Sequence, residues 1–289
     1  MQTAKGNQDV RHRTRDNGSI LPLEWAFWQV EIERPMPASN ATSRFSDRVE
    51  NYVRYRPGYP SEAVRVLQTE CGLTPRHVIA DVASGTGIWT RLLLENGNPV
   101  FAVEPNPEMR QAGERLLAQF PNFVSVSGKA EDTTLDDAGV DFVTSAQAAH
   151  WFDRPAARKE FIRILRPAGW LALMWNERLI DTTPFLRSYE ELLLRFGTDY
   201  EQVRHERTRD AVNEFFDPAP YQQQTFSVFQ EFDYQGLKGR LLSSSYAPGP
   251  GHPKHDPMLR GLRRLFEENA TDGRIVFEYN TRIYFGQLR

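Results

Sequence analysis

The feature that most constrains the fold is a short apolar run that leads directly into a glycine-rich turn. Residues 77–83 (HVIADVA) lack polar alternation, which is typical of a parallel strand covered on both faces. Gly85 and Gly87 follow, and the amphipathic run 88–95 then predicts a helix that ends at Asn96-Gly97. A buried strand, a glycine turn and a helix in this order predict the first unit of a doubly wound α/β sheet.

The alternation of strand and helix continues to residue 177 and then changes. Further strands are expected at 99–104, 123–127, 140–145 and 170–175, with helices at 107–118 and 155–165. Beyond them lie helical segments at 184–196 and 256–269 and two β-rich pieces at 224–233 and 275–285. Strands joined by helices imply parallel pairing with right-handed crossovers. We therefore predict a doubly wound, Rossmann-like, mostly parallel seven-stranded sheet with an antiparallel edge strand, plus a helical insertion near the C-terminus.

The chain is expected to have one folded domain. Residues 1–40 show no usable hydrophobic period and are predicted to be a poorly ordered N-terminal extension. Met36 directly precedes the part with regular patterning and is the expected natural start of translation. Residues 41–289 are predicted to form the domain, with a core at 75–177 and the edge strands and insertion at 178–289.

Charge and cysteine content narrow the functional classes. The 35 Lys and Arg residues are outnumbered by 38 Asp and Glu, so a nucleic-acid partner is not expected. Cys71 is the single cysteine, which excludes an intramolecular disulfide and favours a reducing, cytoplasmic setting. No apolar run approaches 18 residues, so neither a membrane span nor a secretion signal is expected. The histidines lack metal-ligand spacing, and we expect no metal and a monomer or homodimer.

The glycine turn predicts a nucleotide site of a particular kind. A dinucleotide site requires a third glycine three residues after the second, and Thr90 stands there. A phosphate-binding P-loop requires a lysine that this turn lacks. Asp81 begins the turn, and a carboxylate there repels pyrophosphate but can orient the loop or meet an ammonium group. These features favour a positively charged nucleoside without phosphates, such as S-adenosylmethionine (SAM).

Two further acidic positions follow the next strands. Glu104 lies 19 positions beyond Gly85, where a carboxylate can accept hydrogen bonds from both ribose hydroxyls or favour the start of a helix. The third strand ends near Glu131 and Asp132, and either acid can accept from an adenine amino group. A solvated turn is an equally good explanation for this pair.

The order of these motifs resembles a known family. The matching segments are DVASGTG (81–87), AVEPNPEM (102–109), GKAED (128–132), AQAAHWFD (146–153), FIRILRPAGWLALMW (161–175) and FSDRVENYVRYRPGYP (45–60). The chain resembles the class I SAM-dependent methyltransferases, within them the small-molecule group with a type 11 methyltransferase domain, and is similar to trans-aconitate-methyltransferase-like proteins. The likeness covers roughly residues 45–177. Ala83 departs from it, because many members have glycine there.

The resemblance implies a SAM site and an enzyme that methylates an oxygen, nitrogen or carbon of a small molecule. The cofactor-binding residues that it implies are Tyr52, Arg56, Asp81, Ala83, Ser84, Gly85, Gly87, Glu104, Pro105, Asn106, Ala130, Glu131 and Gln147. In this assignment Glu104 holds the ribose, Glu131 lies at the adenine edge and Gln147 lies beside the sulfonium. Arg56 either pairs with the SAM carboxylate or is a surface arginine.

His150 is the candidate catalytic residue. A histidine can remove a proton from the nucleophile near neutral pH, although His150 can equally be a packed residue beside Trp151. Three other functions stay open at this point. They are a SAM-binding protein without catalysis, a nicotinamide-dependent oxidoreductase, and an RNA or protein methyltransferase, which the acidic balance disfavours.

Overall fold

The computed structural model describes residues 49–203 and 208–289. The expected N-terminal extension, residues 1–40, and the expected start at Met36 lie outside the described residues, as do the first positions of the segment 45–60.

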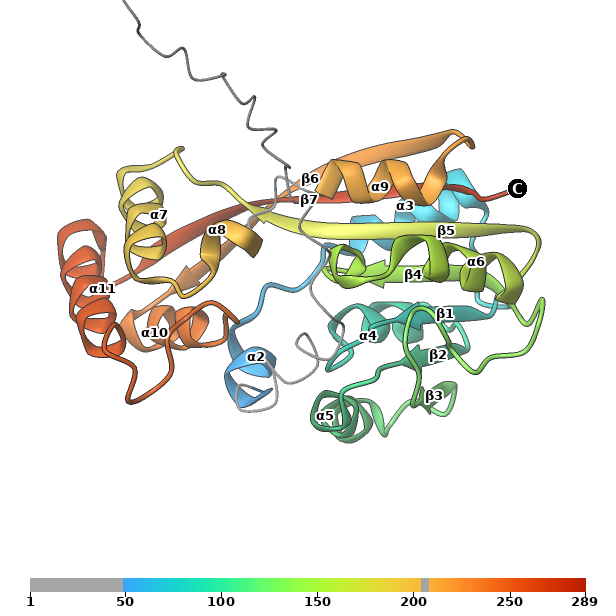
Figure 1. Cartoon of the computed structure of the whole chain (residues 1–289), viewed down its shortest axis with the longest axis horizontal. Helices are drawn as coiled ribbons and strands as arrows, with labels where there is room; N and C mark the ends of the chain where they lie inside the picture. Colours follow the sequence, from blue (N-terminus) through green and yellow to red (C-terminus); the bar gives the residue numbers. More distant parts are fainter. Residues whose placement is uncertain (1–48, 204–207) are drawn as a thin grey trace, which may run out of the picture. The chain divides into compact units, whose positions relative to one another are not determined.

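A sheet of seven strands organises the described residues, in the order β3-β2-β1-β4-β5-β7-β6 (Figure 1). The strands are β1 (Ile79–Val82), β2 (Val100–Val103), β3 (Phe123–Val126), β4 (Val140–Ala146), β5 (Leu165–Arg178), β6 (Tyr221–Phe232) and β7 (Ile275–Gln287). Strands β1 to β5 pair in parallel, whereas β7 is antiparallel to both β5 and β6. The predicted fold class, a mostly parallel Rossmann-like sheet with antiparallel pairing toward one edge, is confirmed.

Helices connect these strands and extend beyond them. They are α2 (Val49–Tyr55), α3 (Ser61–Cys71), α4 (Ile88–Glu95), α5 (Pro107–Leu117), α6 (Arg154–Ile164), α7 (Pro184–Phe196), α8 (Tyr200–Val203), α9 (Thr208–Phe216), α10 (Tyr234–Leu242) and α11 (His255–Asn269). None of the helices in the described part of the chain is long and apolar enough to cross a membrane.

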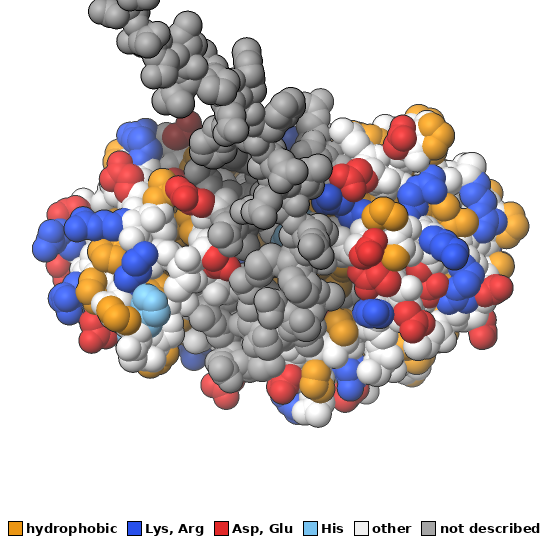
Figure 2. All heavy atoms as spheres, in the orientation of Figure 1, with side chains coloured by type: hydrophobic (Ala, Val, Ile, Leu, Met, Phe, Trp, Pro, Cys, Tyr) orange, Lys and Arg blue, Asp and Glu red, His pale blue; other side chains and the backbone are white. Residues whose placement is uncertain are grey.

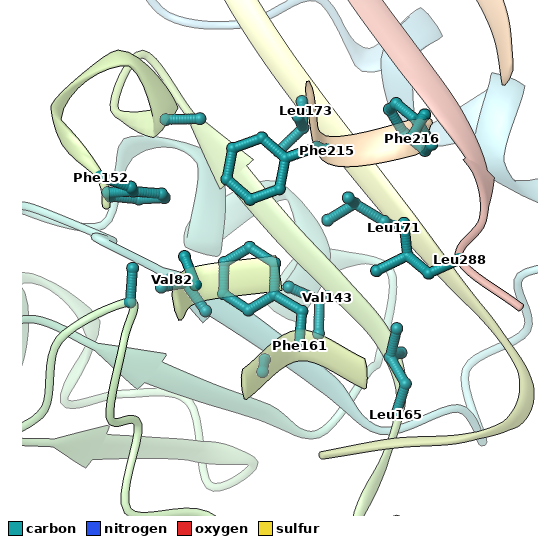
Figure 3. Close-up of a cluster of buried hydrophobic side chains, with 14 of the residues drawn as sticks. Val82, Val143, Phe152, Phe161, Leu165, Leu171, Leu173, Phe215, Phe216 and Leu288 are labelled. Atoms are coloured by element: carbon teal, nitrogen blue, oxygen red, sulfur yellow. The ribbon is translucent and has the colours of Figure 1, made fainter. Parts of the chain in front are cut away.

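The inner strands β1, β2 and β4 are largely buried, as their apolar sequences predict, whereas the edge strand β3 is partly exposed. On one face, Phe161 of α6 stacks on Phe215 of α9, with ring centroids 5.6 Å apart, over Val82 and Val143 (Figure 3). The other face is covered by side chains of α3, α4 and α5, including Trp89. Because both faces of the sheet are covered, a ligand is expected at the carboxyl ends of β1, β2 and β4.

The last three strands are long and carry a further helical layer. Strand β5 has 14 residues, β7 has 13 and β6 has 12, whereas β1 to β3 have four each. A third apolar cluster forms around Phe277 of β7 with side chains of α7, α10 and α11. These helices lie toward the left of Figure 1, away from the parallel strands.

The fifth strand is longer than the predicted range 170–175. Leu165 already pairs with Val140, and the register then shifts before Trp170 pairs with Phe142. Ala168 has a φ of 63° within this stretch. Residues 166–169, which precede the predicted strand 170–175, are therefore an irregularity inside one strand and not a separate loop.

Candidate functional site

The turn after β1 has an unusual backbone. Ala83, Gly85 and Gly87 all have positive φ angles, of 58°, 60° and 84°. This left-handed region is easy for glycine and strained for alanine, and strained residues concentrate at functional sites. A Cβ on Gly87 would lie 2.5 Å from Cδ1 of Leu117. Gly87 is thus required both by its backbone angle and by the close approach of α5. Ser84 lies within the same turn.

Asp81 fixes the base of this turn. Its carboxylate accepts hydrogen bonds from Oγ1 of Thr90, at 2.6 Å, and from Oγ1 of Thr144, at 3.0 Å. The side chain is buried, and burial raises the pKa of Asp81 to about 7. Thr90, which stands where a dinucleotide site has its third glycine, therefore ties α4 to β1. Asp81 was expected either to orient the loop or to meet an ammonium group, and these two hydrogen bonds are of the kind that orients the loop.

Glu104 connects the end of β2 to the glycine turn. Its Oε2 accepts from the backbone N–H of Gly85, and its Oε1 from that of Asn106, both at 2.8 Å. Burial raises the pKa of Glu104, and these two N–H donors and Arg110 oppose the rise. Each carboxylate oxygen has a second lone pair, which can accept from a ligand hydroxyl.

Residues next to Glu104 have structural roles. The side chain of Asn106 accepts from the backbone N–H of Met109, at 2.9 Å, and caps the start of α5. Pro105 is exposed beside it. The expected role of Asn106 and Pro105 in cofactor binding stays a prediction.

The residues after β3 differ in their surroundings. Ala130 is buried in the apolar cluster on the α6 face. Glu131 is half-buried, and its Oε1 accepts from the backbone N–H of Asp153 at 2.9 Å. Asp132 is exposed. Of the two acids that the sequence left open, Glu131 is the one held in place.

Four of the predicted site residues line one pocket. Tyr52, Arg56, Gln147 and His150 line a pocket of about 110 Å³ that is partly open to solvent. Ile88, the first residue of α4, also lines this pocket and joins it to the glycine turn. The other predicted positions, from Asp81 to Glu131, lie outside its lining.

Hydrogen bonds hold Gln147 at the pocket in a strained backbone conformation. Its φ is 60°, an uncommon angle for a residue other than glycine. Its Oε1 accepts from the N–H of Asn176 at 2.8 Å, and Nδ2 of Asn176 donates to the carbonyl of Gly58 at 3.0 Å. Asn176 therefore connects the loop after β4 to the chain segment that follows α2.

The hydrogen bond that His150 makes defines its neutral tautomer. Nε1 of Trp175 lies 3.3 Å from Nδ1 of His150, and an indole N–H can only donate. Nδ1 is therefore an acceptor, and the proton of the neutral ring is on Nε2. The His150 ring also lies 4.8 Å from that of Trp151. The packing that the sequence offered as an alternative to catalysis is present.

Several lining residues were not expected from the sequence as site residues. They are Asn176, Arg178, Tyr200, Tyr279 and Ser245. The available signal was the polar stretch 176–178 directly after an apolar strand. Arg178 forms a buried ion pair with Glu190. Among the described residues, no group of histidine, cysteine or acidic side chains could hold a metal ion.

Comparisons with known proteins agree with this geometry. Residues 80–173 match the family described as methyltransferase domain. An uncharacterised methyltransferase of Mycobacterium tuberculosis is 41% identical over 160 residues, which are 55% of this chain and 61% of that protein. An uncharacterised methyltransferase-like protein of Schizosaccharomyces pombe is 34% identical over 156 residues, 54% of this chain and 59% of that protein. The chain thus spans about three fifths of the length of these relatives.

Solved structures show the same fold at lower identity. A protein of Anaeromyxobacter dehalogenans, described as a proposed type II methyltransferase, aligns with a TM-score of 0.60 and 22% identity, over 81% of this chain and 98% of that one. The YcgJ protein of Bacillus subtilis aligns with a TM-score of 0.51 and 18% identity, over 78% and 97%. Over residues 80–173 the chain is therefore similar to the methyltransferase domain family, and its sheet has the Rossmann-like fold of these solved structures.

Proposed function

We propose that this chain transfers a methyl group from SAM to an oxygen, nitrogen or carbon nucleophile of a small molecule. The observation that carries this proposal is the contact between the strained turn and Glu104, in which the N–H of Gly85 holds a buried carboxylate. This contact lies at the carboxyl ends of β1 and β2, beside the point where the strand order reverses between β1 and β4. Ligands of doubly wound sheets bind at such a point.

The residues present suit a nucleoside that carries no phosphate. Glu104 has lone pairs for the two ribose hydroxyls, and Glu131 is placed at the next strand end for the adenine edge. Asp81 is a buried acid at the base of the turn, which makes the turn unfavourable for pyrophosphate. Thr90 occupies the place of the third glycine and is bonded to Asp81. These features support SAM over a nicotinamide dinucleotide.

The pocket next to the turn is the proposed place of the reaction. SAM supplies a methyl group on a sulfonium, so the acceptor lone pair forms a bond to carbon while the carbon–sulfur bond breaks. The protein must mainly align acceptor, methyl and sulfur, and alignment of this kind contributes up to about 7–11 kcal/mol. We place Gln147 beside the sulfonium, and Tyr52 and Arg56 over the amino-acid end. His150 can act as a base only if its Nδ1 releases the Trp175 N–H.

A pair of measurements tests the proposal. Titration calorimetry with SAM and with S-adenosylhomocysteine should show binding, whereas NADH should not bind. Methyl-labelled SAM incubated with metabolite extracts should then yield a labelled small molecule. NADH binding without SAM binding would reverse the assignment. If SAM binds but no molecule in any extract becomes methylated, the chain is a SAM-binding protein and not an enzyme.

The proposal includes a cytoplasmic protein that acts as a monomer or homodimer. Acidic and basic side chains are interspersed on the described part of the face in Figure 2, which is not the clustered positive surface of a nucleic-acid-binding protein. Light scattering of the purified protein tests the oligomeric state, and a larger assembly would contradict it.

A further inference from the structure

Two arginines line the pocket, Arg240 buried and Arg56 half-buried, and neither has an acidic partner among the described residues. Arg240 of α10 is 6% exposed; its Nε donates to the hydroxyl of Tyr279 at 3.2 Å and its Nη1 to Oγ of Ser244 at 3.1 Å. Nη2 of Arg56 donates to the carbonyl of Ser243 at 2.9 Å, and its buried Nε has no hydrogen-bond partner among the described residues. No carboxylate in the described part of the chain forms an ion pair with either arginine.

A buried positive charge without an opposite charge is unfavourable. Arginines are rarely buried unless paired, because the lost hydration must be replaced. Burial lowers the pKa of Arg56, and the positive charge of Arg240 lowers it further. Arg178, in the same pocket, shows the usual arrangement, since it pairs with Glu190. The pocket therefore has two positive charges that the described side chains do not balance.

The two guanidinium groups come from segments that are far apart in the sequence. Arg56 directly follows α2, and Arg240 lies within α10. The two helices are in close contact, because the ring of Tyr55 passes within 2.0 Å of where a Cβ on Gly239 would be. Any group held by both arginines would therefore also hold α2 against α10.

We propose that Arg56 and Arg240 jointly bind one carboxylate, which bridges α2 and α10 across the pocket. A guanidinium has five N–H donors in a planar fork that matches a carboxylate, and each of these arginines keeps donors that the protein does not use. The carboxylate belongs either to the amino-acid end of the cofactor or to the methyl acceptor. Only this choice of source rests on the function proposed above.

Four probes separate the two sources. S-adenosylhomocysteine carries the amino-acid carboxylate, and 5′-methylthioadenosine is a related thioether nucleoside without it. Succinate is a simple dicarboxylate, and succinamide is its uncharged match. Calorimetry with full-length Arg56→Gln and Arg240→Gln should show affinity lower by about 10- to 100-fold for the probes whose carboxylate uses the site. Arg240→Lys, which keeps the charge but loses the fork, should recover part of the affinity.

Matched variants control for charge. Arg54→Gln removes an exposed charge at the end of α2, and Lys238→Gln removes one from α10 outside the pocket. Both should bind all probes as the wild type does. A loss for S-adenosylhomocysteine alone assigns the carboxylate to the cofactor, and a loss for succinate alone assigns it to the acceptor. No loss for either, beyond that in the controls, overturns the proposal.

Hydrogen exchange measures the bridge directly in the wild-type protein. Amides of α2 should exchange more slowly with a carboxylate-bearing probe than with its uncharged match. Equal protection within both pairs of probes overturns the bridge even if binding is unchanged. If S-adenosylhomocysteine does not bind the wild type, the proposed function fails, while the succinate arm still tests the carboxylate site.

Discussion

Asp81 and Glu104 are both buried acids beside one turn, yet they contact different groups. Within the described part of the chain, Asp81 accepts from the hydroxyls of Thr90 and Thr144, whereas Glu104 accepts from backbone N–H groups. Hydroxyl contacts tie strands and helix together, and backbone contacts set the path of the turn itself. Substitutions of the two acids should consequently affect different properties.

We expect Glu104→Gln to weaken binding of S-adenosylhomocysteine by about 1.5–3 kcal/mol, because a charge-assisted hydrogen bond to the ribose is lost. The substitution keeps the shape of the side chain. Calorimetry measures the change. Glu95→Gln, at the exposed end of α4, is the charge-matched control and should bind normally. Wild-type affinity in Glu104→Gln would remove Glu104 from the ribose site.

We expect Asp81 to make stability depend on pH. Its pKa is raised to about 7 in the folded protein, well above the value of an exposed aspartate near 3.9. The folded state therefore binds the proton more tightly, and stability from this group is lost as pH rises from about 4 through 7. The loss is at most about 4 kcal/mol. Urea unfolding of Asp81→Asn between pH 5 and 8 should show a shallower decline than the wild type, and parallel curves would contradict this.

At the level of elements, the packing of α4 and α5 depends on Gly87, the glycine that directly precedes α4. Gly87 has a left-handed backbone and lies under Leu117 of α5. A side chain there meets both a conformational and a packing penalty. The two penalties can be separated because only the second depends on α5.

We expect Gly87→Ala to destabilise the protein by about 2–5 kcal/mol, from left-handed strain of about 1–2 and overpacking of about 1–3. Leu117→Val removes the Cδ1 atom that the new Cβ would meet. In that background, the cost of Gly87→Ala should fall by about 1–2 kcal/mol. Urea unfolding of the four proteins in the cycle measures this coupling. Additive costs would show that backbone strain alone accounts for the loss.

The sequence predicted elements with local signals and missed those decided by packing. The helix at 88–95 was predicted with its observed bounds, since its apolar period and the Asn96-Gly97 stop are both local. Helix α10 was not expected, because Gly236 and Gly239 lower helix propensity. Both glycines are required by neighbours: a Cβ on Gly236 would lie 2.7 Å from the ring of Phe232.

The relative positions of the candidate site residues could be predicted where these residues follow a strand end. The turn at 81–87 and Glu104 lie together because parallel strands end at one edge. Arg178 and Tyr279 could not be predicted, because the pairing of β5 with β7 places both at the pocket, and no local pattern shows this register. That Arg240 is buried against Tyr279, with no acidic partner among the described residues, is likewise visible only once α10 and β7 are in place.

At the scale of the whole molecule, the glycine turn and the pocket lie on different parts of one sheet. The turn belongs to the parallel strands, and much of the pocket lies on the extended β5 and β7 and the helices beyond. A ligand that contacts both parts should therefore stabilise both against unfolding, so that they unfold together.

We expect S-adenosylhomocysteine at 100 times its dissociation constant to raise the free energy of unfolding by about 2.7 kcal/mol, because it binds only the folded state. Thermal unfolding should show one transition that moves to higher temperature with ligand concentration. NAD⁺ at equal concentration is the control and should leave the transition in place. Two transitions, of which one moves, would show that the two parts unfold separately.

The hydrogen bonds of Asn176 have a consequence for how the chain acquires its binding site during synthesis. This residue bonds to Gly58, 118 positions earlier, and accepts from Oγ1 of Thr281, 105 positions later, at 2.5 Å. Contacts between such distant positions form late and slow the folding rate. While the chain is on the ribosome, the pocket wall at Asn176 lacks its β7 partner until residue 281 emerges from the exit tunnel. Affinity for the ligand should thus appear in a late step of folding.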